Sequence, residues 1–408
     1  MGRRIVWLIA LISVLAACSE DQDAPGETSS TSSTTTTTST LPEEVPSDPG
    51  RLAVVDSAGN IIVMEPDGSN LQAVTDRGDD PVLYMQPIWA PDGQRLAWGQ
   101  RTGTGFGIGI ARVGTDETKT LTTPNLPYYT YWSPDGRHLA ALHNGDSGVQ
   151  FQIIDVDDET AELLDEDTPF YFSWSPAGDR VVTHAGVSRT QVITPDGERE
   201  DLEPTSGTYL SPQWTPNGVF HVVGNLLMLE DAQGQRTPLA DVSGLTMFVS
   251  NAQGTHVALQ TTGGSDLTAS TEDFPAIASN SVVVVEVETG DTEIVDDALA
   301  LGFFWSPNGR SLLVLTLSGS EVVPTVWTSD GEEQVFSPYV PSRSMLRDAF
   351  PFFPQYAQSV SFWAPDSSAF AFAGTLEGES GVWVQALAEE APRRVSDGTW
   401  VAWSPPSP

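Results

Sequence analysis

Short runs of alternating or continuous apolar residues, each bounded by polar turns, follow one another along most of the chain. One unit has an apolar run at His138 to Leu142, a second at Gln150 to Val156, a polar turn at Asp157 to Thr160, and a third run at Ala161 to Leu164. Runs of this length between turn-forming residues are typical of β-strands joined as hairpins. The pattern predicts an all-β protein built from short strands.

A tryptophan two residues ahead of a proline marks each unit, usually as Trp-Ser/Ala/Thr-Pro-Asp/Asn-Gly. In this motif the proline presets φ at the second position of a type I turn, and the glycine can take the positive φ at which the next strand begins. Four strands per unit, at intervals of about forty residues, predict a β-propeller. The seven copies begin at Trp89, Trp132, Trp174, Trp214, Trp305, Trp363 and Trp403.

The long interval between Trp214 and Trp305 contains a degenerate copy of the motif, with Ser250 at the tryptophan position. The last copy supplies only a first strand at the C-terminus, whereas Arg51 to Val55 resembles a strand that follows the motif turn. Pairing of these two ends would close the ring and leave no open sheet edge. We therefore predict eight blades, or seven if the unit around Ser250 is not a full blade.

The N-terminus has the pattern of an export signal. Arg3 and Arg4 precede an apolar run from Ile5 to Leu15 that is too short to span a bilayer stably. Leu15-Ala16-Ala17-Cys18 then resembles a bacterial lipoprotein signal, in which the chain is cut before the cysteine and the thiol is lipid-modified. Cys18 is the only cysteine, so no thiol remains for a disulfide or a metal site.

These features divide the chain into a signal peptide (1–17), a lipidated cysteine with a Ser/Thr-rich linker (18–50) and the propeller (51–408). The linker offers no apolar face to bury, which is typical of a disordered tether. We expect the protein to be anchored on the extracytoplasmic side of a membrane, either periplasmic or on the cell surface. The net charge of −37, with Lys119 as the only lysine, argues against binding nucleic acid, which needs clustered basic side chains.

The Trp-Ser-Pro-Asp-Gly units resemble the WD-like repeats of TolB-type β-propellers, and the resemblance covers residues 51–408. It implies a propeller that acts as a binding platform in the cell envelope. TolB itself carries an α/β domain before its propeller and binds the peptidoglycan-associated lipoprotein. Here a lipid-anchored stalk takes the place of that domain, so the TolB partner is not carried over.

No constellation of catalytic residues is evident, and we expect no cofactor and no metal site. Gly145-Asp146-Ser147-Gly148 has the look of a nucleophile loop, but its position in the repeat predicts a hairpin turn. The five histidines, His138, His143, His184, His221 and His256, stand at differing offsets from the motif glycine, whereas a metal ring would need equivalent positions. The motif tryptophans recur in every unit, which indicates packing between blades.

The segment from Ser337 to Ser359 is the most individual part of the chain and is expected as an insertion between two blades. Ser342 is placed to cap a short helix that runs to Phe350 and ends at Pro351. The segment would plug one end of the channel, contact a partner directly, or do both, because arginine and aromatic residues are common in binding hot spots. The candidate partner-binding residues are Tyr339, Arg343, Arg347, Phe350, Phe352, Phe353 and Tyr356. A second insertion, Thr261 to Ser281, is polar and is expected to be a mobile loop.

These patterns predict a non-enzymatic binding or scaffold module with a protein or glycan partner, held to the membrane through the lipid on Cys18. Two alternatives remain open. One is an enzyme of the lyase, glycosidase or dehydrogenase type with its site in the central channel, and the other is a sensor for a glycan or another small ligand.

Overall fold

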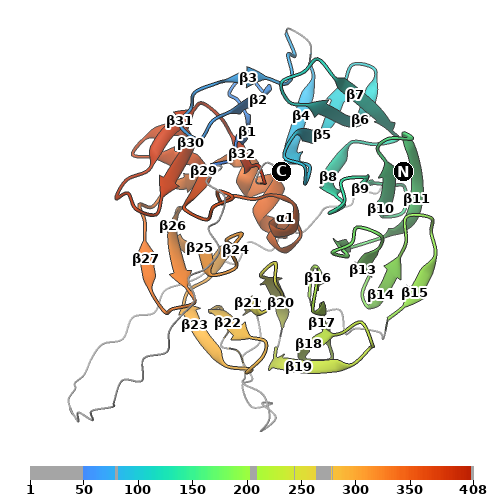
Figure 1. Ribbon diagram of the computed structural model, residues 1–408, viewed down its shortest axis with the longest axis vertical. Helices are drawn as coiled ribbons and strands as arrows, with labels where there is room; N and C mark the ends of the chain where they lie inside the picture. Colours follow the sequence, from blue (N-terminus) through green and yellow to red (C-terminus); the bar gives the residue numbers. More distant parts are fainter. Residues whose placement is uncertain are drawn as a thin grey trace, which may run out of the picture. The chain divides into compact units, whose positions relative to one another are not determined.

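The computed structural model describes residues 49–78, 81–202, 209–242, 244–262, 277 and 279–405. Within these residues, 32 strands form eight four-stranded antiparallel sheets that stand around a central channel (Figure 1). The prediction of an all-β propeller with eight blades is confirmed. Most of the insertion at Thr261 to Ser281 lies outside the described residues. In the part of the chain that is described, no helix is long and apolar enough to cross a membrane.

The blades are numbered along the chain, and their strands run from the channel outward. Blade 1 has β32 (Trp400–Trp403), β1 (Leu52–Val55), β2 (Ile61–Met64) and β3 (Gln72–Ala73); blade 2 has β4 (Leu83–Trp89), β5 (Arg95–Thr102), β6 (Gly105–Arg112) and β7 (Thr118–Thr123); blade 3 has β8 (Pro127–Trp132), β9 (His138–Asn144), β10 (Val149–Asp155) and β11 (Thr160–Asp167); blade 4 has β12 (Phe170–Trp174), β13 (Val181–Ala185), β14 (Arg189–Ile193) and β15 (Arg199–Asp201). Blade 5 has β16 (Gln213–Thr215), β17 (Gly218–Val223), β18 (Leu226–Glu230) and β19 (Arg236–Asp241); blade 6 has β20 (Leu245–Ser250), β21 (His256–Thr262), β22 (Val282–Glu286) and β23 (Thr292–Asp296); blade 7 has β24 (Ala300–Trp305), β25 (Ser311–Ser318), β26 (Glu321–Thr328) and β27 (Glu333–Val335); blade 8 has β28 (Val340–Pro341), β29 (Ala369–Leu376), β30 (Glu379–Ala386) and β31 (Arg393–Ser396).

The two ends of the propeller meet in blade 1, as the sequence predicted. The C-terminal strand β32 pairs antiparallel with β1, in a register that sets Leu52 opposite Trp403 and Val55 opposite Trp400. All residues of both strands are buried. The first and last described strands therefore share one sheet, and this pairing closes the ring.

The motif turns have the geometry that their composition requires. In blade 3 the amide of Gly136 donates to the carbonyl of Ser133 at 2.8 Å, and Gly136 has a φ of 71°. The degenerate copy keeps the same turn, because the amide of Gly254 donates to the carbonyl of Asn251 at 3.0 Å. Blade 6 is thus a full blade although Ser250 has replaced the tryptophan, and the fallback of seven blades is not needed.

The motif tryptophans join neighbouring blades. All seven rings are buried or half-buried, and six of them, all but Trp214, lie in or pack against the larger hydrophobic core cluster. Five of them also donate the indole N–H to a backbone carbonyl, and in four of these the carbonyl belongs to the residue just before the motif position of the preceding blade. The five bonds run from Trp89 to Ala402 (3.2 Å), Trp174 to Tyr131 (3.3 Å), Trp305 to Val249 (2.9 Å), Trp363 to Phe304 (2.9 Å) and Trp403 to Pro49 (2.8 Å).

A cationic or imidazole side chain, two residues after the motif glycine, covers the tryptophan of the next blade. Arg95 lies over Trp132 with its guanidinium carbon 4.8 Å from the ring centroid, and its Nη2 donates to the carbonyl of Gly136. His138 stacks on Trp174 in the same way, at 6.3 Å between ring centroids. The scaffold role predicted for the tryptophans is confirmed, and this histidine belongs to the scaffold as well.

Replacing a motif tryptophan with phenylalanine will distinguish the contribution of the indole hydrogen bond to stability from the contribution of ring burial. Trp363 and Trp132 are equally buried, but only Trp363 has a carbonyl partner among the described residues. We expect Trp363→Phe to lower the free energy of unfolding by about 1–2 kcal/mol more than Trp132→Phe, because it leaves the Phe304 carbonyl unpaired. Equilibrium denaturation of both variants measures the difference. Equal losses would show that these bonds do not hold the blades together.

Candidate functional site

The aromatic insertion interrupts the innermost strand of blade 8. The strand begins as β28, where Val340 pairs with Thr375 of β29, and it resumes where Trp363 pairs with Phe370 near the other end of β29. Between these points the chain leaves the sheet and forms α1 (Phe353–Ser359) at the centre of the ring (Figure 1). The segment does begin between blades 7 and 8, at Ser337 to Tyr339, but its helical part interrupts the innermost strand of blade 8 and does not link two blades.

The insertion is helical for longer than its sequence suggested. Ser342 does act as a cap, since its Oγ accepts the amide of Met345 at 3.2 Å. A π-helical turn, η2 (Met345–Ala349), is followed by a 3₁₀ turn, η3 (Phe350–Phe352), and then by α1. Pro351 does not end the helical segment as predicted. It lies in the first turn of η3, as Pro354 does in α1, where a proline costs no hydrogen bond because the amide has no partner within the helix.

α1 plugs the channel and contacts strands of several blades. It packs against the innermost strands β8, β12, β20 and β24. Phe353 lies against two phenylalanines of blade 7, with its ring centroid 4.6 Å from that of Phe303 and 6.0 Å from that of Phe304. The channel is therefore filled with packed side chains along α1.

Gln355 ties the plug to blades 3 and 4 and is buried. Its Oε1 accepts the amide of Phe172 at 2.8 Å, and its Nε2 donates to the carbonyl of the same residue at 2.7 Å. The hydroxyl of Tyr129 donates to the Gln355 carbonyl at 2.9 Å. One side chain thus satisfies both backbone polar groups of Phe172, which lies on the innermost strand and has no further strand to pair with.

Tyr356 ties the plug to blades 2 and 3. Its hydroxyl donates a hydrogen bond to the carbonyl of Tyr128 at 2.9 Å and accepts one from Nε2 of Gln86 at 2.8 Å. Burial raises the pKa of Tyr356, so the phenol stays protonated and keeps donating in the physiological range. Gln86 has a φ of 50° at a register shift in β4, and a non-glycine residue in this conformation needs support from its surroundings.

The seven candidate partner-binding residues fall into two groups. Tyr339, Phe350, Phe353 and Tyr356 are buried, so they support the plug and could contact a partner only if the segment opened. Arg343, Arg347 and Phe352 are exposed, together with Leu346, which the sequence did not single out. Arg347 pairs with Asp348 through two bonds of 2.6 Å, and the ion pair raises the pKa of Arg347.

A cavity lies at each end of the plug. The smaller one has a volume of about 230 Å³ and lies between the turn after β1, the start of β4 and the segment from Ser344 to Asp348. The larger one has a volume of about 410 Å³ and lies among the motif turns, beside the end of α1. They are at opposite ends of the ring, because Trp400 and Trp403, the two ends of β32, line the smaller and the larger cavity respectively.

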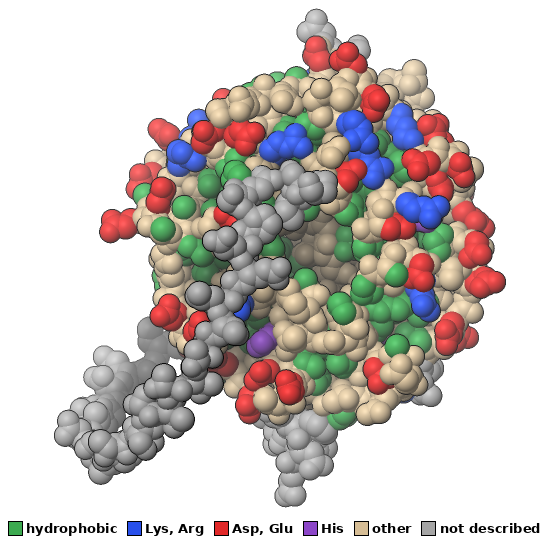
Figure 2. All heavy atoms as spheres, in the orientation of Figure 1, with side chains coloured by type: hydrophobic (Ala, Val, Ile, Leu, Met, Phe, Trp, Pro, Cys, Tyr) green, Lys and Arg blue, Asp and Glu red, His purple; other side chains and the backbone are tan. Residues whose placement is uncertain are grey.

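Charged side chains gather away from the channel. On the face drawn in Figure 2 the ring is hollowed at its centre, and the Asp and Glu side chains lie mainly toward the rim. The side chains that line the larger cavity include no Asp, Glu, His, Lys or Arg among the described residues. The larger cavity is therefore uncharged and largely aromatic, whereas the smaller one is lined by Asp56, Arg77, Arg347 and Asp348.

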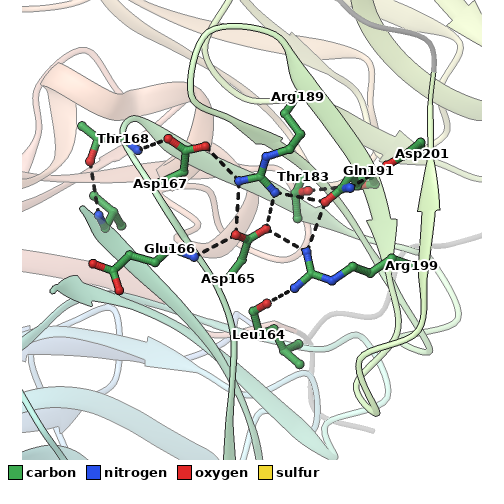
Figure 3. A network of polar contacts seen from close by, with 11 residues as sticks. Leu164, Asp165, Glu166, Asp167, Thr168, Thr183, Arg189, Gln191, Arg199 and Asp201 are labelled. Carbon is green, nitrogen blue, oxygen red and sulfur yellow. Dashed lines mark hydrogen bonds and ion pairs between the residues drawn. The ribbon is translucent and has the colours of Figure 1, made fainter. Parts of the chain in front are cut away.

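The densest ion-pair cluster among the described residues joins the outer strands of blades 3 and 4 (Figure 3). Asp165 accepts hydrogen bonds from Arg189 Nη2 at 3.1 Å and from Arg199 Nη1 at 3.0 Å. Arg189 also donates to Asp167 at 2.9 Å. Burial alone would raise the pKa of Asp165, but the hydrogen bonds from the two arginines outweigh it and lower that pKa. These carboxylates neutralise arginines of the next blade, which is a structural use.

The histidines are spread over four blades and do not converge. All five lie on the second strand of a blade, namely β9, β13, β17 and β21. His184 stacks on Tyr209 at 4.2 Å, and Nε2 of His221 lies 3.2 Å from Glu230. Within the described residues, no group of three or more His, Cys, Asp or Glu side chains is placed to hold a metal ion. Gly145–Gly148 forms the turn between β9 and β10, as predicted.

Sequence reasoning missed the polar residues that hold the plug, namely Gln86, Tyr129, Ser211 and Gln355. The hydroxyl oxygen of Ser211 accepts a hydrogen bond from Nε2 of Gln358 at 2.8 Å. The one available signal was the pair of glutamines, Gln355 and Gln358, within an otherwise aromatic and proline-rich segment. A polar side chain in such a segment has to find partners once it is buried.

The fold defines the protein as a β-propeller, and comparisons with solved structures agree. Similar structures include a eukaryotic initiation factor (TM-score 0.53, 14% identity, covering 89% of this chain and 100% of that one) and prolyl endopeptidases (0.53, 12%, 80% and 50%). TolB from Acinetobacter baumannii is also similar (TM-score 0.40, 17% identity, 71% of this chain), and the match spans 64% of the TolB chain. The prediction of a β-propeller is confirmed at the level of the fold.

Comparisons of the sequence with protein-family models and with curated proteins find no match. The similar structures include enzymes as well as an initiation factor, and at this level of identity they share the fold alone. Any function must therefore be argued from the residues of this chain.

Replacing Gln355 with alanine will loosen the plug. We expect Gln355→Ala to lower the free energy of unfolding by about 2–4 kcal/mol, because it leaves the buried amide of Phe172 without a partner and its carbonyl with only the longer contacts from Ser211 Oγ at 3.5 Å and Gln358 Nε2 at 3.4 Å. Gln358→Ala is the control, since Gln358 is only half-buried and its loss should cost about 1 kcal/mol or less. Denaturation together with hydrogen exchange at residues 345–359 measures both effects. Similar small losses in the two variants would contradict a central role for Gln355.

Proposed function

We propose that this protein is a non-enzymatic binding module, lipid-anchored outside the cytoplasmic membrane, that presents the propeller to a protein or glycan partner in the cell envelope. The observation that carries this proposal is the plug. It occupies the channel, where an enzyme built on this fold would place its site, and it holds an exposed patch at one end of the ring.

The contents of the channel favour binding over catalysis. The polar groups along α1 are amide and phenol side chains engaged in hydrogen bonds with each other and with the backbone, as for Gln355 and Tyr356. Catalysis by general acids and bases needs titratable groups with pKa values near the working pH. The buried phenols have pKa values raised far above that range. No observation favours the alternative of an enzyme with its site in the channel.

The exposed side chains of the insertion supply a surface for a partner. Arg343, Leu346, Arg347 and Phe352 combine two guanidinium groups with two large apolar groups. They belong to a segment whose buried half is fixed by the plug, so little conformational entropy remains to be lost on binding. Arginine and aromatic residues on a rigid support are typical of binding hot spots. The protein is strongly acidic elsewhere, which makes this patch distinctive on its surface.

Charge reversal in this patch will abolish partner binding. We expect the full-length double variant Arg343→Glu/Arg347→Glu to lose its specific crosslinked partners in intact envelopes, because an acidic or polar partner surface would meet two carboxylates. The matched control is Arg137→Glu/Arg310→Glu, which makes the same charge change at two exposed motif turns. Crosslinking followed by mass spectrometry compares the two with the parent protein. An unchanged set of partners in the first variant would limit the insertion to a structural role.

Removing the cysteine will release the protein from the membrane. We expect Cys18→Ala to move the protein from the membrane fraction to the soluble fraction, because the thiol that would carry the lipid is gone. Ser19→Ala is the control and should stay with the membrane. Detergent-phase partitioning and the mass of the processed N-terminus test both variants. A Cys18→Ala protein that remained in the membrane fraction would contradict the proposed anchor.

A further inference from the structure

The smaller cavity, at the end of the ring that carries the insertion, combines charged side chains with an apolar wall. Its volume is about 230 Å³. A cavity of about 150 Å³ holds benzene, which has six non-hydrogen atoms, so a space of this size has room for about nine. The apolar wall includes Val82, Leu83 and Met85, which are half-buried, and the buried ring of Trp400 also lines the cavity. We name this space the plug-end cavity.

Four charged side chains of the described residues line the plug-end cavity, and two of them neutralise each other. Arg347 donates Nε and Nη2 to the two carboxylate oxygens of Asp348, at 2.6 Å each. The other two are Asp56 and Arg77, which form no ion pair within the described part of the chain, either with each other or with a third residue. Both are half-buried, so a ligand can reach them. The cavity therefore has one carboxylate and one guanidinium without a charged partner.

The turn between β1 and β2 holds these two groups in place. The amide of Asn60 donates to Oδ1 of Asp56 at 2.8 Å, and Oδ1 of Asn60 accepts the backbone amide of Arg77 at 2.9 Å. Nη1 of Arg77 donates to the carbonyl of Ala58 at 3.1 Å and lies 2.8 Å from the position that a Cβ atom would take at Gly59. Ala58 and Gly59 line the same cavity, so the guanidinium lies at its wall. Groups that are held in this way lose little freedom when a ligand binds.

The two unpaired groups are within reach of one small ligand. The amide of Gly59 donates to the carbonyl of Asp56 at 3.0 Å, so the residue that Arg77 contacts lies directly beside Asp56 in a tight turn. A ligand with a single charge would pair with one of the two groups and be repelled by the other. A ligand that carries a carboxylate and an ammonium group would form charge-assisted hydrogen bonds with both.

A free α-amino acid has these two charges on neighbouring atoms, and its side chain would lie against the apolar wall. Leucine and methionine each have nine non-hydrogen atoms, which is the size that the volume of the cavity allows. We infer that the plug-end cavity binds a free aliphatic α-amino acid, whose carboxylate accepts from Arg77 and whose ammonium donates to Asp56. This inference does not depend on the partner proposed for Arg343 and Arg347, because Asp56 and Arg77 lie outside that patch.

The test is calorimetric titration of the full-length protein with L-leucine and with three analogues of it. Leucinamide lacks the carboxylate, N-acetyl-leucine lacks the ammonium, and glycine lacks the apolar side chain. We expect saturable binding of leucine. Each analogue should bind about tenfold more weakly or worse, because it leaves one group of the cavity without its partner.

Two neutral variants assign the charges. Arg77→Gln should weaken leucine binding about tenfold and leave the affinity for leucinamide unchanged, because this analogue has no carboxylate to pair. Asp56→Asn keeps the acceptor for the Asn60 amide, and it should weaken leucine binding about tenfold while leaving N-acetyl-leucine unaffected. A variant that had merely lost its fold would weaken all ligands alike. The matched controls are Arg101→Gln and Asp76→Asn, at exposed residues that do not line the cavity, and both should bind leucine as the parent protein does.

Several outcomes would overturn the inference. One is the absence of saturable binding at millimolar leucine, and another is a leucine affinity that Arg77→Gln and Asp56→Asn leave unchanged. N-acetyl-leucine that bound as tightly as leucine would assign the cavity to a lone carboxylate, as at the C-terminus of a peptide. Leucinamide that bound as tightly would assign it to a lone ammonium, as at an N-terminus, and equal binding of glycine would contradict the role of the apolar wall. Each of these results leaves the crosslinking test of Arg343 and Arg347 unaffected.

Discussion

Burial of a motif tryptophan between neighbouring blades, in every blade except blade 6, is the interaction on which most of the ring depends. Each motif ring fills the space between two sheets, and in blades 2, 4, 7 and 8 its N–H also satisfies a carbonyl of the preceding innermost strand. That strand has a free edge toward the channel, so its backbone groups need such partners. The same residue therefore supplies both apolar burial and a hydrogen bond at these four seams, which explains why the motif recurs.

A ring of eight blades leaves a central channel, and this chain fills it with its own insertion. The plug satisfies some of these edge groups, as Gln355 does for both backbone groups of Phe172. It also divides the channel into two separate ends. At one end lie the exposed arginines and apolar side chains of the insertion, and at the other lies the uncharged cavity among the motif turns. The exposed patch and the cavity among the motif turns thus both result from the insertion that fills the channel.

The fold was predictable because its signals are local and repeated. A proline and a glycine at fixed turn positions specify each hairpin, and seven copies make the count robust even where Ser250 replaces the tryptophan. The site was predictable only as a segment. Composition marked Ser337 to Ser359 as unusual, but it did not indicate which aromatic rings would be buried, since Phe350 and Phe352 are alike in sequence and opposite in exposure.

The sequence by itself determined the propeller, its eight units, the pairing of its two ends and the structural role of the tryptophans, because each of these depends on short-range turn chemistry and on repetition. Only the tertiary structure decided that the insertion starts within a strand of blade 8, passes through the channel and finds hydrogen-bond partners on several other blades. Gln86 and Tyr356 are far apart in the chain, and nothing local to either one encodes their contact. Likewise, the sequence does not indicate that the indole N–H of Trp132 lacks a hydrogen-bond partner. This difference is recognised only when the structure is compared with motif tryptophans that donate to a carbonyl, such as Trp363.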